Sequence, residues 1–167
     1  MPSETIEKLL GLSLPEDYKL FLTSHTKSGF DGDATYPLKE ITPLGDSAVI
    51  DLLHTAEEII KSEYFGFSSP RMLFIGDNLF GSSTCLCLEE DRFGHVYYYD
   101  IGGRSSWDDD TFRSMFPNLA PELKNYLETR RVGELPQKDE AFANFYLSAT
   151  SFTDFYESIV IQDFEDE

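Results

Sequence analysis

The sequence TCLCLEEDRFGHVYYY, residues 84–99, decides the fold class of this chain. It contains two runs of β-favouring residues, 84–88 and 95–99, which are separated by the polar turn 89–94. A third short and mostly apolar run, residues 71–75, precedes them. We therefore expect a meander of three antiparallel strands in the middle of the chain.

Two helices are predicted at the amino-terminal end. Residues 6–10 have the apolar spacing of a short amphipathic helix that ends near Gly11. The segment SLPE, residues 13–16, has the pattern of a capping box and a proline suited to the first helical turn. We expect a second helix to start there and to stop at residues 27–29. Its apolar stripe consists of Leu14, Tyr18, Phe21 and Leu22.

The middle of the chain mixes turn residues with short regular patterns. Residues 30–46 are rich in Gly, Pro, Asp and Thr, which predicts a loop with short extended pieces. A strand is expected at residues 48–52, and the capping box TAEE, residues 55–58, predicts a helix after it. Residues 119–130 have helical spacing, whereas the pattern of residues 141–149 fits either a strand or a helix.

A last helix is predicted near the end of the chain. Thr150 or Ser151 can cap it, and four apolar residues within 152–159 share one of its faces. Residues 162–167 are interpreted as a short acidic tail. The predicted fold class is α+β, an antiparallel-rich mixed sheet with N-terminal and C-terminal helices packed against it. The length and the absence of repeats predict a single domain over residues 1–167.

The net charge is the most unusual bulk property. The chain has 31 acidic and 13 basic residues, which gives −18 at pH 7. Such a charge repels nucleic acid and anionic membranes, and it speeds encounters with basic proteins. Solubility is the alternative explanation for the acidity. We expect a basic protein partner, no direct contact with nucleic acid and no membrane partner.

The composition also indicates where the protein works. No apolar stretch approaches eighteen residues, and the start MPSE lacks a basic segment followed by an apolar run. Cys85 and Cys87 would lie about 6.6 Å apart on a strand, which is marginal for a disulfide. We expect reduced thiols and a cytoplasmic location.

One segment has the glycine spacing of a phosphate-binding loop. GDNLFGSS, residues 76–83, follows a predicted strand. However, Ser82 occupies the position of the lysine that contacts phosphate, and a strand rather than a helix follows. We therefore interpret the segment as a hairpin loop.

No combination of side chains predicts catalysis or metal binding. Cys85 and Cys87 could supply two zinc ligands, but a closed site needs four. His25, His54 and His95 are scattered along the chain, which argues against both a metal site and a Cys–His nucleophile. We expect no cofactor, although a hydrolase that uses paired carboxylates stays as an alternative, which a pocket of converging carboxylates would support.

The predicted partner-binding residues are acidic or aromatic. Trp107 adjoins three carboxylates, and tryptophan is a common interface hot spot, although a core position explains it equally well. The YYY run 97–99 presents rings to both sheet faces, so at least one ring is expected to be exposed or covered by another element. Solvated loops are the alternative for the acidic clusters. The full set is Asp31, Asp33, Glu89, Glu90, Asp91, Tyr98, Asp100, Trp107, Asp108, Asp109 and Asp110.

Three segments, in this order, carry a resemblance to a known family. The first is IEKLLGLSLPEDYKLFL, residues 6–22, followed by KSG at 27–29. The second runs from FIGDNLFG, residues 74–81, to GHVYYYD, residues 94–100. The third is ATSFTDF, residues 149–155. Together they resemble the SUKH superfamily, which includes a yeast regulator of cell-wall synthesis and many bacterial immunity proteins, although the family usually has Asn-Gly-Gly where KSG stands here.

The resemblance implies a SUKH-like domain that binds a protein and has no enzymatic activity. We expect an immunity protein that binds a cognate bacterial toxin and occludes its active surface. The toxin is expected to be a basic nuclease or another domain that acts on nucleic acid. An intracellular scaffold or regulator like the yeast relative is the alternative. Residues 101–144 match no family segment, and partner contacts are expected there and in the acidic loops.

Overall fold

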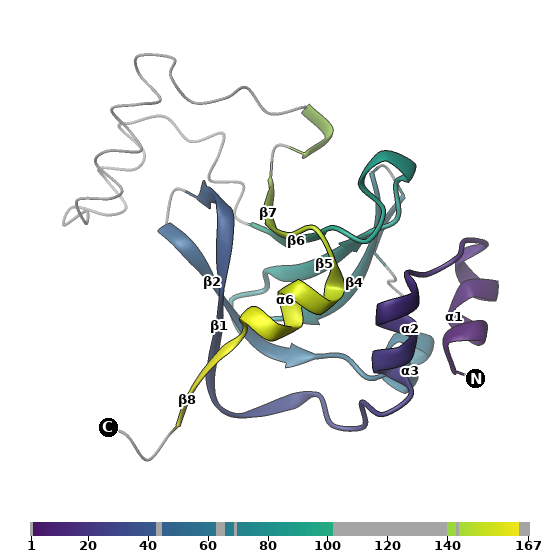
Figure 1. Cartoon of the computed structure of the whole chain (residues 1–167), viewed down its shortest axis with the longest axis horizontal. Helices are drawn as coiled ribbons and strands as arrows, with labels where there is room; N and C mark the ends of the chain where they lie inside the picture. Colours follow the sequence, from purple (N-terminus) through teal and green to yellow (C-terminus); the bar gives the residue numbers. More distant parts are fainter. Residues whose placement is uncertain are drawn as a thin grey trace.

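The computed structural model describes residues 2–42, 45–62, 66–68, 70–101, 140–142 and 144–163. Within these ranges the chain forms an eight-stranded sheet with helices packed against it (Figure 1). The strands are β1 (Gly29–Thr42), β2 (Gly45–Leu53), β3 (Gly66–Ser68), β4 (Arg71–Asp77), β5 (Ser83–Cys87), β6 (Val96–Tyr99), β7 (Phe145–Ala149) and β8 (Val160–Asp163). The helices are α1 (Pro2–Leu10), α2 (Glu16–Leu22), α3 (Ala56–Lys61) and α6 (Phe152–Ser158), with the short 3-10 turns η1 (Glu90–Arg92) and η3 (Glu140–Phe142).

The sheet confirms the α+β prediction. Its order is β7-β6-β5-β4-β2-β1-β8, with β3 also paired to β4, and every pairing between described strands is antiparallel. The predicted meander is β4-β5-β6. The segment that fitted either a strand or a helix, residues 141–149, contains β7. The helix predicted at 119–130 lies outside the described residues.

The sheet curls until β7 lies against β1. The backbone N–H of Leu147 donates to Glu40 Oε1 at 2.9 Å, and Ser148 Oγ donates to the carbonyl of Pro37 at 2.9 Å. On its other stretch β1 pairs with β8, so two different elements cover one long edge of β1. This closure protects most of that edge from pairing with another chain.

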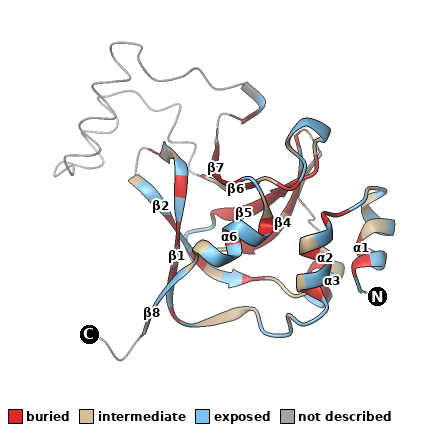
Figure 2. Ribbon diagram, in the orientation of Figure 1, coloured by how far each residue is buried: buried red, intermediate tan, exposed pale blue. Residues whose placement is uncertain are grey.

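Alternate residues of the central strands face two separate cores. In β5, Leu86 faces the main core, whereas Cys85 and Cys87 face a second, mostly aromatic one. In β6, Tyr98 packs against the main core and Tyr97 lies in the second. Figure 2 shows the resulting concentration of buried residues along the strands. The YYY run is thus covered on both faces, because β3, η3 and β7 close the second core.

The helices enclose the main core. They contribute Ile6 from α1, Tyr18 from α2, Ile59 from α3, and Phe152 and Phe155 from α6, all at most 3% exposed. These side chains pack on one face of the sheet, as the sequence predicted. None of the described helices is long and apolar enough to cross a membrane.

The loop predicted at residues 30–46 is wrong, because β1 occupies most of it. Among its turn-type residues, buried and exposed side chains alternate as in a strand. Ala34, Tyr36 and Leu38 are buried, while Asp33 and Pro37 are exposed. Pairing with β2 and β8 overrides the weak local preference for a strand.

The helix caps were predicted with mixed success. The capping box at Thr55 is confirmed, with Thr55 and Glu58 exchanging both hydrogen bonds. Ser151 caps α6 by accepting from the N–H of Asp154 at 3.1 Å. The capping box predicted at residues 13–16 is wrong, since α2 starts after Pro15 without a side-chain cap. Residues 162–163, which were predicted to begin the acidic tail, belong to β8.

Candidate partner-binding groove

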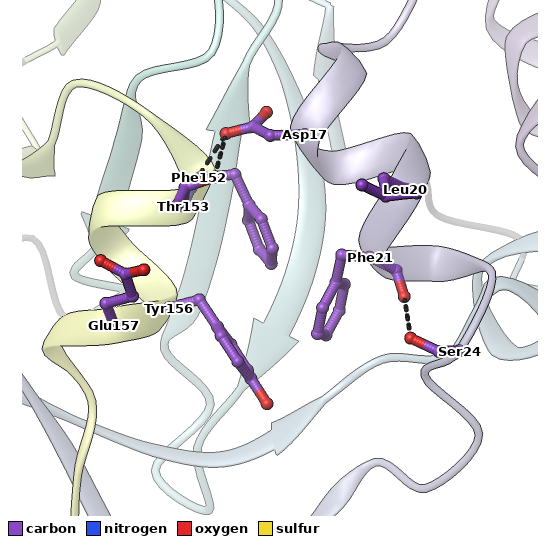
Figure 3. Close-up of a pocket in the computed structure, with 8 residues that line it drawn as sticks. All are labelled: Asp17, Leu20, Phe21, Ser24, Phe152, Thr153, Tyr156 and Glu157. Atoms are coloured by element: carbon purple, nitrogen blue, oxygen red, sulfur yellow. Dashed lines mark hydrogen bonds between the residues drawn. The ribbon is translucent and has the colours of Figure 1, made fainter.

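A groove lies between α2 and α6 and has a volume of about 260 Å³. It joins the second helix of the chain to the last one, so its two walls are more than a hundred residues apart in sequence (Figure 3). The lining residues are Asp17, Leu20, Phe21, Ser24, Phe152, Thr153, Tyr156 and Glu157.

Aromatic rings form the floor of the α2–α6 groove. The ring centroid of Phe21 lies 4.7 Å from that of Phe152 and 5.0 Å from that of Tyr156. Beneath them Tyr18 meets Phe152 edge to face at 4.9 Å. Phe152 is buried in the main core, whereas Tyr156 is 47% exposed. The ring cluster therefore extends from the core to the surface.

Asp17 fixes the two helices relative to each other. Its Oδ2 accepts from the backbone N–H of Thr153 at 2.9 Å and from the Thr153 hydroxyl at 3.0 Å, as Figure 3 shows. Its Oδ1 accepts from the N–H of Tyr18 at 2.9 Å. Because these bonds tie both walls to one carboxylate, the groove is held in a defined shape without any ligand.

The groove is apolar inside and acidic at its rim. Leu20 projects from α2 with 74% of its surface exposed. Asp17 and Glu157 line the groove, and none of the eight described lining residues is a lysine or an arginine. The nearest basic residue along α2, Lys19, pairs with Glu16 at 2.8 Å and with Glu7 at 3.8 Å. An apolar site with unneutralised carboxylates suits a cationic side chain.

The predicted acidic contact residues that the structure describes lie on separate elements of the fold. Asp31 and Asp33 are exposed on β1, where Asp33 lies opposite Gln162 of β8. Glu90 and Asp91 are exposed in the η1 turn after β5. In Figure 1 that teal turn lies at the upper right and β8 at the lower left. Trp107, Asp108, Asp109 and Asp110 lie outside the described residues.

Three predicted contact residues make contacts within the chain. Asp100 is 2% exposed where the chain leaves β6, and its N–H donates to the carbonyl of Asn144. Tyr98 is half-buried against the main core. Glu89 accepts from the N–H of Arg71 at 2.9 Å and so holds the start of β4.

A second cavity of about 420 Å³ is lined by a histidine, two serines and two carboxylates, among other residues. His54 Nε2 lies 2.9 Å from Asp77 Oδ2, and Ser83 Oγ donates to Asp77 Oδ1 at 3.1 Å. His54 Nδ1 lies 3.9 Å from Glu58 Oε2. The hydrogen bond to Asp77 raises the pKa of His54, and the same bond lowers the pKa of Asp77.

The arrangement of the His54 cavity differs from that of a nucleophilic site. Such a site needs the serine hydroxyl bonded to the histidine, which then takes its proton. Here both Ser83 and His54 bond to Asp77 instead. The described residues also contain no group of three or more His, Cys, Asp and Glu side chains that could hold a metal ion. The hydrogen bonds of Asp77 connect the residue that follows β2 to strands β4 and β5.

The hairpin interpretation of residues 76–83 is confirmed, because they connect β4 and β5. Asn78 holds the turn: its Oδ1 accepts from the N–H groups of Phe80 and Ser82, and its Nδ2 donates to the Val49 carbonyl. Leu79 at the tip is 86% exposed. The two cysteines of the adjoining strand are free and buried, which raises the pKa of both thiols.

The groove itself was not predicted from sequence, although a signal for it exists. Leu20 lies outside the apolar stripe of α2, and a leucine there has no core to enter. Tyr156 is one of the four apolar residues within 152–159 that the sequence predicts on one face of the last helix, yet nearly half of its surface is exposed. Only the packing of α2 on α6 brings these two residues to one groove.

One comparison with known proteins found a match. The model of the SMI1 / KNR4 family (SUKH-1) matches residues 4–158 of the chain. No curated protein and no solved structure matches it. The matched range includes both helices of the groove and all three segments that carry the resemblance.

Proposed function

Because the chain belongs to the SMI1 / KNR4 family (SUKH-1), we propose that it is an immunity protein that binds and neutralises a cognate bacterial toxin. The observation that carries the proposal beyond the family is the net charge of −18. A toxin that acts on nucleic acid needs a basic surface to hold the phosphate backbone. An acidic protein competes for that surface and covers it.

Charge and apolar contact have separate roles in this proposal. Long-range attraction between an acidic and a basic protein raises the association rate, whereas buried anchors lower the dissociation rate. Exposed Asp31, Asp33, Glu90 and Asp91 support the first role, because they add negative charge both on β1 and in the η1 turn. Inhibition then follows from occlusion of the toxin surface, without any reaction.

Two further observations support binding rather than catalysis. The SMI1 / KNR4 family is not known as a family of enzymes. In the His54 cavity, Ser83 and His54 both bond to Asp77, so this serine is not bonded to the histidine that would take its proton.

We expect the chain to meet its toxin in the cytoplasm.

The proposal is tested with any toxin that is encoded beside this gene. The two products are co-expressed and purified through a tag on the toxin, and the growth of cells that express the toxin is measured with and without this protein. We expect a stable complex and restored growth. Failure to bind or to protect against any neighbouring toxin contradicts the proposal, and it favours the scaffold or regulator role of the family's cell-wall branch.

A further inference from the structure

We propose that the α2–α6 groove binds an arginine side chain of the basic partner, with its stem on Leu20 and Phe21 and its guanidinium at the ring of Tyr156 and the acidic rim. The identity of the partner rests on the proposed function. The preference of the groove for arginine can be measured without that partner.

The first argument is apolar surface that the fold leaves uncovered. Leu20 is 74% exposed and Tyr156 is 47% exposed, and both line the same cavity. Phe21 connects them, because its ring lies 5.0 Å from that of Tyr156. A ring pair that is packed on one side and open on the other offers a flat surface on which an alkyl stem or a planar cation can lie.

The second argument is unpaired negative charge. Among the described residues, no lysine or arginine lies within ion-pair distance of Glu157 or of Asp154, one turn before it on α6. Lys19 is engaged by Glu16 and Glu7, so it does not neutralise the groove. The rim therefore attracts a cation that the described part of the chain does not supply.

The third argument distinguishes arginine from lysine. A guanidinium is planar and weakly hydrated, so it stacks on an aromatic ring while its N–H groups reach a carboxylate. An ammonium is a compact, strongly hydrated charge that gains less from a ring. A volume of about 260 Å³ between two helices suits one long side chain rather than a whole structural element.

Asp17 acts on the groove indirectly. Both of its oxygens accept hydrogen bonds from the chain itself, which fixes α2 against α6. We therefore treat Asp17 as a positioning residue and leave it unchanged in the binding test.

The test is an NMR titration of the full chain with N-acetyl-arginine N′-methylamide. The matched probe is the citrulline analogue, which has nearly the same shape without the charge. We expect saturable shifts at amides of α2 and α6 with the arginine probe and much smaller ones with citrulline. Equal responses to the two probes, or no response in these helices, overturns the proposal.

Two variants identify the contacts within the groove. Glu157→Gln removes the rim charge and Tyr156→Leu removes the ring, and each is expected to weaken binding of the arginine probe about two- to fivefold. Asp46→Asn removes one exposed charge from β2, outside the groove lining, and is expected to leave binding unchanged. A loss with Asp46→Asn as large as that with Glu157→Gln overturns the proposal, because it indicates nonspecific charge attraction. Unchanged amide shifts in β4, β5 and β6 before titration control for folding.

The toxin distinguishes this inference from the proposed function. If the toxin binds the native chain and the variants equally, the groove assignment is wrong while the immunity function stands. If no neighbouring toxin binds but the arginine probe does, the proposed function fails and the arginine site stands.

Discussion

Asn78 performs with a side chain what tight turns usually achieve with backbone bonds alone. Its amide satisfies two N–H groups of its own turn and the Val49 carbonyl on β2, and the residue is 8% exposed. The segment with the phosphate-loop pattern is therefore a turn that Asn78 holds. The bonds hold the apolar tip at Leu79 in one conformation in solvent.

Replacing Asn78 tests this role. Asn78→Ala leaves three backbone groups without their partner, which is expected to lower the free energy of unfolding by about 2 kcal/mol. Urea unfolding measures the change. Leu79→Ala is the control, because a side chain that is 86% exposed costs within about 0.5 kcal/mol when truncated. Equal effects of the two variants contradict the role of Asn78.

The His54–Asp77 pair predicts a pH dependence of stability. His54 has a raised pKa in the folded chain, so its contribution is complete below the unfolded value of about 6.5 and is lost as the pH rises through the folded pKa. Asp77 has a lowered pKa, so its contribution is lost only as the pH falls through that folded pKa. Between the two folded values the ion pair is intact.

Removal of the carboxylate isolates this effect. Asp77→Asn is expected to cost about 1 kcal/mol near pH 6, because the carboxylate is partly exposed, and less above the folded pKa of His54. NMR titration of the histidine rings checks the direction. His95 is the internal control, since burial lowers its pKa. A His54 pKa below 6.5 in the native chain contradicts the prediction.

At the scale of elements, β8 depends on a glycine in the strand beside it. A Cβ on Gly32 would collide with the Gln162 carbonyl and lie 2.8 Å from its carbon atom. We expect Gly32→Ala to separate β8 from β1 and to cost about 2 kcal/mol. Faster hydrogen exchange in residues 160–163 reports the separation.

The control for this substitution lies in the same strand. Gly29→Ala meets no atom within 4 Å, so exchange in β8 is expected to stay slow. If both variants keep β8 protected, the close approach of the two backbones is not what restricts residue 32.

The elements that could be predicted from sequence are those with local determinants. The cap at Thr55, the cap at Ser151 and the meander of β4 to β6 each depend on a few consecutive residues. By contrast, β1 is a strand because β2 and β8 pair with it, and β8 lies about 130 residues further along the chain. No short window of sequence contains that information. The groove was missed for the same reason.

At the scale of the whole molecule, the net charge predicts how binding responds to salt. Between about 0.1 M and 1 M salt the screening length falls from about 10 Å to about 3 Å. We expect the association rate with a basic toxin to fall by about tenfold or more, while the dissociation rate changes little. Surface plasmon resonance over a salt series measures both rates.

A charge variant tests whether the η1 turn contributes to this attraction. Glu90→Gln combined with Asp91→Asn removes two exposed carboxylates and should make the salt dependence of the association rate shallower. Both residues are in the set predicted from sequence, whereas Glu89 is kept because it holds β4. An association rate that is independent of salt contradicts electrostatic attraction altogether.

The two buried cysteines turn the chain into its own unfolding reporter. The sequence contains two cysteines, and the structure places both Cys85 and Cys87 at 0% exposure. A thiol reagent therefore modifies the chain only when β5 opens, so the labelling rate measures opening events without an added dye. For the same reason, a cysteine introduced at Leu20 would be labelled selectively in the native state, and a fluorophore attached there would stand at the mouth of the α2–α6 groove.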